Sequence, residues 1–529
     1  MKNRYNNFKK LGGLLLIAIL AWSCVKDLDT EPLDPSAFTS DKVFDNPDSY
    51  KEFLAKIYGS LTLTGQQGQY GKPEIEAQDE GTTSFLRVYW SAQEVTTDEA
   101  INAWNDPGLV EFHGHIWSDD NLYLKLLYQR IFINIAYANE YIREVGSRAG
   151  DVSGSLKTDV NYFLNEARFL RAFYYYTALD FWGNVPFVTE KDKTGAFLPD
   201  QIKRADLFEY IEKELLDIEK GLMDARTNEY ARADKAAAWM LLAKLYLNAE
   251  VYLGAGNSRY TECLTYLNKV IDAGYSLAPV YANLFLTDNN ISNNEAIFVI
   301  AEDGSNTQNY GGVTYIVNAA TGTNNAYMGV SSGWYGNRPT NTFIQKFDTA
   351  NDARASFDLT GHTADITNPA DFTQGYFCTK FRNVSSEGVS GQNTTFVDTD
   401  FPVFRLADAY LMYAEAVLRG GQGGTIAGAV GYVNQLRERA FGNTDNNIDA
   451  AGLSLDFIID ERARELYWEA HRRTDLIRFG LFTGDDYLWD WKGDVKEGQA
   501  TGSHLALFPL PAFDRAVNTK LKQNEGYGN

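Results

Sequence analysis

Alanine residues at helical spacing among large apolar residues constrain the fold of this 529-residue chain most strongly. The pattern occurs in three segments, around residues 167–179, 236–246 and 409–416. Small side chains at this spacing let helices approach closely, and large apolar ones fill the gaps between them. The copies follow no fixed period. We therefore expect a mostly α-helical scaffold of tetratricopeptide-like helix pairs, wrapped together with non-repeat segments and with little β structure.

Apolar periodicity predicts the individual helices, and composition marks the segments between them. The expected helices cover residues 47–61, 122–145, 160–182, 207–222, 235–249, 264–273, 406–418, 428–440, 455–469 and 513–521. From 289 to about 400 the chain is rich in Asn, Gly, Ser and Thr, with interleaved Tyr and Trp. Long irregular stretches in a compact protein are usually functional or disordered. The aromatic residues favour an ordered, functional segment here.

The first 24 residues have the layout of a lipoprotein signal. A basic start is followed by an uncharged, largely apolar run from Leu11 to Trp22, and Ser23 stands before Cys24. The run is shorter than the roughly 20 residues that a membrane-spanning helix needs. We expect removal of residues 1–23, acylation of Cys24 and attachment of the exported chain to a membrane by lipid. Ala21 stands where Leu is more usual, and an ordinary signal peptide is the alternative.

The chain is strongly acidic and poor in cysteine. Its formal charge is −22, and removal of the four basic residues of the signal would make it −26. Such a charge repels nucleic-acid phosphates and anionic lipid head groups, so neither is an expected partner. Cys263 and Cys378 remain; they could pair in an oxidising compartment, but two buried free thiols fit equally well.

Two acidic or serine-containing motifs resemble catalytic ones but have simpler explanations. Glu461, Glu465 and Glu469 lie on one face of a helix with arginines in reach, which favours an ion-pair lattice over a general acid and base. The segment 329–333 fits the G-x-S-x-G string of serine hydrolases. That motif requires a helix directly after it, and the residues that follow will not begin one. We therefore expect no catalytic residue and no enzyme activity.

Histidines offer only a weak metal signal. His113 and His115 alternate as they would on one face of a strand and could share a metal ion. No nearby cysteine completes a ligand set, so a packing role is expected instead. The sequence predicts no cofactor and no metal site, with a structural calcium ion left open.

Four stretches, taken together, resemble a known family. They are Asn165–Tyr175 leading to Trp182–Pro186, Arg405–Ala416, Asp460–Arg478, and Leu507–Pro511 followed by Gln523–Tyr527. In this order, behind a lipoprotein signal, they resemble the SusD/RagB family of outer-membrane nutrient-binding lipoproteins. The resemblance covers essentially the whole mature chain.

This resemblance implies an architecture and a location. A helical side would pack against a TonB-dependent (SusC-like) outer-membrane transporter, and a loop-rich face would bind the ligand. Lys26, Asp27 and Asp29 resemble a surface-export signal, which places the protein on the outer membrane, exposed at the cell surface. The implied divisions are a signal (1–23), a tether (24–41), an N-terminal region (42–288), a loop-rich insert (289–400) and a C-terminal region (401–529), in one compact unit.

Aromatic and short polar residues supply the candidate ligand site. A sugar ring has an apolar face that Trp or Tyr can cover and a rim of hydroxyls that Asn, Asp, Gln or Arg can bind. One cluster comprises Asp98, Glu99, Trp104, Asn105 and Asp106; Trp104–Asp106 resembles the family's W-x-D stretch in a ligand-side loop. The other comprises Trp334, Tyr335, Asn337 and Arg338, and weaker candidates are Tyr89, Trp90, Tyr310 and Tyr327.

These residues lead to one main hypothesis and three rivals. The main hypothesis is a cell-surface, glycan-binding lipoprotein that captures oligosaccharides for nutrient uptake and delivers them to the transporter. A peptide ligand, as in the RagB branch of the family, is the first rival. A surface glycosidase and a helical-repeat adaptor without a small ligand are the others. A glycosidase needs two carboxylates set apart across a cleft, and the sequence marks no such pair.

Overall fold

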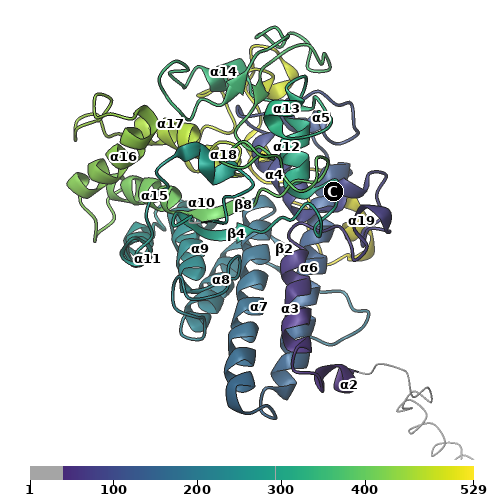
Figure 1. Ribbon diagram of the computed structural model, residues 1–529. Coiled ribbons are helices and arrows are strands. Elements are labelled where there is room, and N and C mark those ends of the chain that lie inside the picture. The colour runs from purple at the N-terminus through teal and green to yellow at the C-terminus, as the bar shows by residue number, and fades with distance from the viewer. Residues whose placement is uncertain (1–39, 292, 529) are drawn as a thin grey trace, which may run out of the picture. The chain divides into compact units, whose positions relative to one another are not determined.

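Helices are the main regular secondary structure of this computed structural model, which describes residues 40–291 and 293–528 (Figure 1). The longer helices are α3 (Ser49–Gly59), α4 (Phe85–Glu94), α6 (Leu122–Arg148), α7 (Gly154–Phe181), α8 (Arg204–Ile218), α9 (Lys235–Leu247), α11 (Tyr260–Asp272), α12 (Gly312–Ala319), α15 (Leu406–Leu418), α16 (Ile426–Phe441) and α17 (Leu455–Leu466). The predicted lipidation site Cys24, the signal and most of the tether lie outside the described residues.

Short elements connect these helices. The short α-helices are α2 (Ser40–Phe44), α5 (Val110–Gly114), α10 (Ala249–Leu253), α13 (Asn325–Met328), α14 (Asn341–Ile344), α18 (Arg472–Arg478) and α19 (Ala512–Val517). The 3₁₀ turns are η1 (Gly68–Tyr70), η2 (Glu80–Thr83), η3 (Tyr281–Phe285), η4 (Lys492–Asp494) and η5 (Ser503–Ala506). The strands are β1 (Ile101–Asn102), β2 (Val185–Pro186), β3 (Gln201–Ile202), β4 (Ala296–Ile300), β5 (Asn337–Arg338), β6 (Phe357–Asp358), β7 (Phe377–Cys378) and β8 (Phe401–Arg405).

The chain divides into two compact units, residues 1–51 and 52–529. The first contains α2 and the start of α3. The second contains the other elements, and everything described below lies within it. In this unit α6 packs on α7, α7 on α8, α9 on α11, α11 on α15, and α15 on α16. The predicted mostly α fold with tetratricopeptide-like helix pairs is confirmed.

The alanine pattern has the expected effect on packing. Ala236, Ala237, Ala238 and Ala243 of α9 are completely buried, so α9 can lie close to its neighbours. The two-stranded antiparallel ribbon β4–β8 packs on α7 through aromatic edges. The ring centroids of Phe169 and Phe298 are 5.3 Å apart in this contact. Cys263 and Cys378 are both buried free thiols, the second of the two alternatives left open by the sequence.

Most observed helix boundaries differ from the predicted ones by a few residues; α7 begins at Gly154 rather than 160, and α8 covers Arg204–Ile218 rather than 207–222. Helix α15 has the predicted bounds, but α17 ends at Leu466 rather than 469, because Trp468 and Ala470 have positive φ angles of 66° and 63°. Helix α19 ends at Val517, short of the predicted 521. Helices α4 and α12 were not predicted; almost every residue in them is buried, polar ones such as Arg87 and Asn318 included.

Candidate ligand-binding site

A short antiparallel pairing brings the two predicted clusters together. Strand β1 pairs with β5, so that Asn102 lies opposite Asn337. The Asn102 side-chain amide donates to Asn337 Oδ1 at 2.6 Å, and Asn102 Oδ1 accepts from the Trp104 backbone N–H at 2.7 Å. Residues more than 230 positions apart therefore meet at one edge of the loop-rich region. In Figure 1 this region, with α12, α13 and α14, lies at the top of the view.

Three aromatic side chains from three separate segments form the centre of the site, and we call them the aromatic trio: Trp104, Tyr310 and Trp334. The ring centroids of Trp104 and Trp334 are 6.3 Å apart, and those of Tyr310 and Trp334 are 6.2 Å apart. The Trp104 indole N–H donates to the Trp334 carbonyl oxygen at 3.0 Å. Both tryptophans are half-buried, and Tyr310 is 38% exposed. The trio therefore presents apolar ring surface to solvent in a fixed arrangement.

A buried arginine supports the trio from beneath. The Arg87 guanidinium carbon lies 4.5 Å from the Tyr315 ring centroid and 5.9 Å from that of Trp104, within the range of cation–π attraction. Arg87 Nη1 also donates to the Tyr310 carbonyl oxygen at 3.1 Å. Its Nη2 pairs with Asp79 at 2.9 Å, and the Asp79 side chain is 44% exposed while that of Arg87 is only 3% exposed. Arg87 thus connects the trio to an accessible carboxylate.

Asp79 and Arg87 are site residues that the sequence analysis missed. Arg87 lies in the first turn of α4, between the apolar residues Leu86 and Val88. A charge between apolar residues was the only feature of the sequence that could have drawn attention to it. Asp79 precedes η2 and accepts from the Gly81 backbone N–H at 3.0 Å. Neither residue belongs to the two predicted clusters, and both are distant in sequence from Tyr310 and Trp334, so only the tertiary structure reveals their association with the trio.

Among the other predicted site residues, several are accessible to a ligand. Asn105 and Asp106 are exposed directly after Trp104. Tyr335 is half-buried next to Trp334. Tyr327 is 55% exposed, and the Arg382 guanidinium carbon lies 4.5 Å from its ring centroid. Their roles in binding remain predictions.

Five of the remaining predicted site residues are buried within the protein, so the expectation that they touch ligand is corrected. Trp90, Asp98, Glu99, Asn337 and Arg338 are at most 2% exposed. Tyr89 is half-buried and packs on Phe85. Each of the five has at least one polar group bound to a partner inside the protein, for example the Trp90 indole N–H, which donates to the Trp468 carbonyl oxygen at 2.9 Å. They support the site from behind.

Asp98 shows how such a residue is held. Arg472 binds both of its carboxylate oxygens at 2.7 Å, and the Tyr487 hydroxyl donates at 2.6 Å. Burial favours the neutral acid, but the Arg472 charge outweighs it and lowers the pKa of Asp98. Asp98 is therefore an ionised structural anchor between the β1 region and α18.

The predicted ion-pair lattice is formed by Glu461 and Glu465 of α17 and by Glu469, which lies just beyond the end of that helix. Glu461 and Glu465 both contact Arg354, at 2.8 and 3.2 Å. Glu465 and Glu469 both contact Arg405, at 2.7 and 2.6 Å. All five side chains are essentially inaccessible to solvent. Buried and saturated by cations, these carboxylates cannot serve as an acid and base on a substrate.

The histidines and the G-x-S-x-G string have structural positions. His113 lies in α5 and His115 caps that helix with a φ of 52°, so the predicted strand is wrong. Gly329, also at positive φ, caps α13, and no strand–turn–helix surrounds the string. Among the residues that the structure describes, no three His, Cys, Asp or Glu side chains gather in a way that could hold a metal ion.

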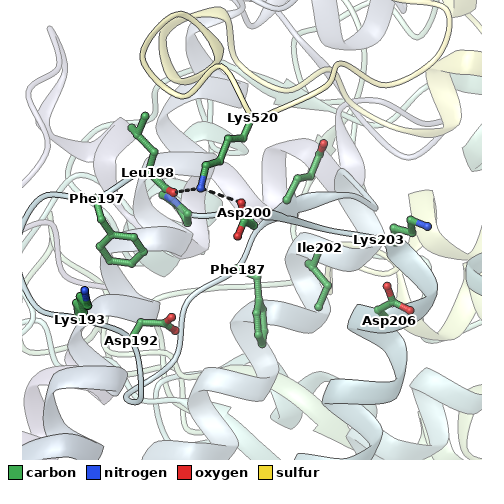
Figure 2. A pocket seen from close by; sticks show the side chains of 12 residues that line it. Phe187, Asp192, Lys193, Phe197, Leu198, Asp200, Ile202, Lys203, Asp206 and Lys520 are labelled. Atoms are coloured by element: carbon green, nitrogen blue, oxygen red, sulfur yellow. Dashed lines mark hydrogen bonds and ion pairs between the residues drawn. The ribbon is translucent and has the colours of Figure 1, made fainter.

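A cleft of about 610 Å³ lies apart from the aromatic trio, between the 187–203 loop and the C-terminal segment (Figure 2). Its lining combines apolar side chains such as Phe187, Phe197 and Ile202 with charged ones. Lys520 at its edge donates to the Leu198 carbonyl oxygen and pairs with Asp200 at 2.8 Å. The lining contains neither Trp nor Tyr. This cleft lacks the broad aromatic faces that distinguish the trio.

Comparison with known proteins assigns the family. The family model described as "SusD family" matches residues 358–527, and that described as "Starch-binding associating with outer membrane" matches residues 39–247. The starch-binding protein SusD of Bacteroides thetaiotaomicron is 34% identical, with both chains covered completely. The chain belongs to the SusD family. A SusD-like protein P2 of Formosa agariphila is 25% identical over 79% of this chain and 83% of its own.

Solved structures show the same fold as this SusD-family chain. A SusD superfamily protein from Bacteroides vulgatus superposes with a TM-score of 0.70 at 18% identity, over 92% of this chain and all of its own. Surface glycan-binding protein A from Bacteroides thetaiotaomicron, solved in complex with laminarihexaose, superposes with a TM-score of 0.67 at 20% identity, over 90% and 99% of the two chains. None of the helices within residues 40–291 and 293–528 combines the length and apolar character needed to span a membrane.

Proposed function

We propose that this chain is a non-enzymatic, glycan-binding lipoprotein of the outer membrane, and that the aromatic trio is its binding surface. The observation that carries the proposal is the meeting of Trp104, Tyr310 and Trp334 from three distant segments, with their rings about 6 Å apart and partly open to solvent. Aromatic rings left half-exposed by a protein that buries most of its other large side chains are suited to contact with a ligand.

The chemistry of the site fits carbohydrate. The trio offers apolar faces against which the axial C–H groups of pyranose rings can pack. Asp79, Asn105 and Asp106 lie on the same segments as the trio or beside its supporting arginine, and their exposed oxygens and amide can bind hydroxyls. The protein would then act by binding and releasing the sugar rather than by breaking its bonds. The saturated carboxylates of α17 support this non-enzymatic proposal.

Membrane attachment and partner complete the proposal. Lipid at Cys24 would hold the protein to the outer membrane at the cell surface, consistent with the outer-membrane association in the description of the matched family model. Captured oligosaccharide would pass to a TonB-dependent transporter. The relatives named for starch binding and glycan binding support a sugar ligand, and a peptide ligand is the rival outcome of the test.

Isothermal titration calorimetry with maltohexaose, laminarihexaose and a set of oligopeptides tests the ligand class. Loss of one indole face removes on the order of 2 kcal/mol of apolar contact, so Trp104→Ala or Trp334→Ala should weaken sugar binding by at least about ten-fold. Phe197→Ala, an exposed ring at the cleft of Figure 2, is the matched control and should leave affinity unchanged.

Three results would contradict the proposal. Full sugar affinity in both Trp104→Ala and Trp334→Ala would show that the trio is not the binding surface. Binding of oligopeptides but of neither sugar would favour the peptide alternative. Release of shorter sugars by the purified protein would show that it is an enzyme. For the partner, purification of the wild-type protein from outer membranes should recover a TonB-dependent transporter with it.

A further inference from the structure

The turn next to the trio places two aromatic residues in sequence on an unusual backbone. Tyr335 directly follows Trp334 and has a φ of 55°, in the left-handed region that residues other than glycine rarely adopt. Such a conformation is strained and persists only where surrounding contacts enforce it. Contacts with neighbouring segments must therefore hold Tyr335 in this strained conformation.

Three consecutive backbone hydrogen bonds enforce this turn. The N–H groups of Trp334, Tyr335 and Gly336 donate to the carbonyl oxygens of Asn318, Thr321 and Ala319 at 2.8, 3.0 and 2.8 Å. Two of these acceptors belong to the last turn of α12, whose carbonyls have no partner inside the helix. The turn therefore serves as the cap of α12, and both aromatic rings are held rigidly relative to that helix.

The ring of Tyr335 joins a second aromatic contact, separate from the trio. It stacks on the His362 imidazole with centroids 6.4 Å apart and planes inclined by 20°. It also meets the edge of Phe377 at 6.1 Å. Tyr335 and His362 are both half-buried, whereas Phe377 beneath them is only 1% exposed. The stack thus has a buried base and a solvent-facing side.

The histidine is set to act as a hydrogen-bond acceptor on that side. His362 Nδ1 lies 3.2 Å from the Gly375 carbonyl oxygen, which requires the proton on Nδ1 and leaves a lone pair on Nε2. Burial lowers the pKa of His362 further below neutrality, so the imidazole is uncharged at pH 7. An uncharged ring with a free acceptor can accept a hydrogen bond from a hydroxyl.

A buried arginine fixes the loop that carries His362, residues 359–376 between β6 and β7. Arg338 donates to three carbonyl oxygens of this loop: Asp371 at 2.8 Å, Gln374 at 2.5 Å and Pro369 at 2.5 Å. The Trp491 indole N–H donates to the Ile366 carbonyl oxygen at 3.0 Å. Arg338 is adjacent to Asn337 in β5, the strand that places Trp334 against Trp104. The same strand therefore sets the trio and the loop.

From this arrangement we propose that Tyr335 and His362 form a second stacking subsite, continuous with the aromatic trio, that selects longer oligosaccharides. Cα atoms of consecutive residues are about 3.8 Å apart, so Trp334 and Tyr335 are within reach of a single chain of a few sugar units. Short ligands would contact the trio alone. Longer ligands would also cover Tyr335 and donate a hydroxyl to His362 Nε2. This inference rests on the proposed glycan-binding function and adds the preference for chain length.

Calorimetric titration of the full-length protein with maltooligosaccharides of three to seven units tests the inference. Tyr335→Asn removes the ring with a residue that tolerates positive φ, so the turn is retained. His362→Ala removes the second ring without altering that turn. Phe372→Ala, an aromatic residue 47% exposed on the same loop, is the control.

The wild-type protein should bind maltoheptaose more tightly than maltotriose. Each subsite variant should lose about five-fold in affinity for maltoheptaose, while its affinity for maltotriose is unchanged. Phe372→Ala should behave as wild type. Equal heptaose affinity in wild type, Tyr335→Asn and His362→Ala would overturn the subsite, while Trp334→Ala would still show whether the trio binds sugar. Failure of the wild-type protein to bind any of these sugars, or laminarihexaose, would overturn the proposed function and the subsite with it.

Discussion

The ion-pair lattice around α17 and the aromatic trio differ in their interactions: the lattice consists of buried, matched charges, and the trio consists of partly exposed rings. In the lattice, Glu465 and Arg405 are buried and their charges are matched by several partners, so the region is closed to solvent. In the trio, rings from three segments are partly open, and one buried cation, Arg87, supports them without filling their exposed faces. The two regions differ in that a closed network of buried charges stabilises the scaffold, whereas the trio keeps aromatic surface accessible.

This contrast predicts that lattice variants change stability and that variants of the trio change affinity. The largest expected effect is that of Arg405→Ala. Removing this guanidinium leaves Glu295, Glu465 and Glu469 short of a buried partner, which should lower the free energy of unfolding by about 3–5 kcal/mol. Urea denaturation measures the change. Lys235→Ala, which breaks an exposed pair with Asp224, should cost less than about 1 kcal/mol. Equal losses in the two variants would remove the distinction between lattice and surface pairs.

The second prediction concerns pH. Burial raises the pKa of Glu302 to about 7, against the hydrogen bonds from Thr62 and Thr307 and the Val313 backbone N–H, which lower it. An unfolded glutamate ionises near 4.5, so between that pH and about 7 the unfolded state releases its proton first. Stability should therefore fall as pH rises through this range, by up to roughly 3 kcal/mol.

Glu302→Gln should make that fall in stability smaller, since a neutral amide cannot titrate; Glu99, Asp234 and Asp400, whose pKa values burial also raises, would still contribute to it. Thermal unfolding at pH 4.5, 6 and 8 measures it. Glu461 of the lattice should affect stability in the opposite direction. Burial raises its pKa, but Arg354 and neighbouring arginines outweigh this and lower it to about 2. Its contribution to the free energy of unfolding is therefore present above pH 4.5 and is lost as pH falls toward 2. A Glu302→Gln protein with the wild-type slope between pH 4.5 and 7 would show that Glu302 is ionised in the folded state.

The smallest predicted effect tests how tightly the trio is positioned. A Cβ atom on Gly336 would lie 2.7 Å from the Trp104 indole, closer than any real contact. Gly336→Ala should displace Trp104 and weaken maltohexaose binding by about three- to ten-fold, with a stability loss near 1 kcal/mol. Gly431 of α16 has open space around its Cβ position, so Gly431→Ala should leave affinity unchanged and slightly stabilise the helix. Unaltered binding in Gly336→Ala would mean that the position of Trp104 is not critical.

Much of the scaffold could be predicted from the sequence, because amphipathic helices such as α8 and α11 carry their own periodic signal. Helices α4 and α12 were not predicted, and in both the polar residues are buried together with the apolar ones, so no solvent-facing side alternates with a core side. For the site, the sequence could identify Trp104 and Trp334 as candidates from residue type. It could not separate exposed from buried polar neighbours. The sequence could not exclude Asp98 from ligand contact, because its partner Arg472 is 374 residues away. Their pairing exists only in the folded chain.

The hydrogen bond from Trp104 to the Trp334 carbonyl has a consequence for selectivity. An indole has a single N–H, and in this protein that group is already engaged. Trp104 can therefore offer a ligand only its carbon face, which is indifferent to the orientation of individual hydroxyls. Discrimination between one sugar linkage and another must fall to the oxygens and amides at the edge of the surface, so exchanging those edge residues would retune preference while the tryptophans stay unchanged.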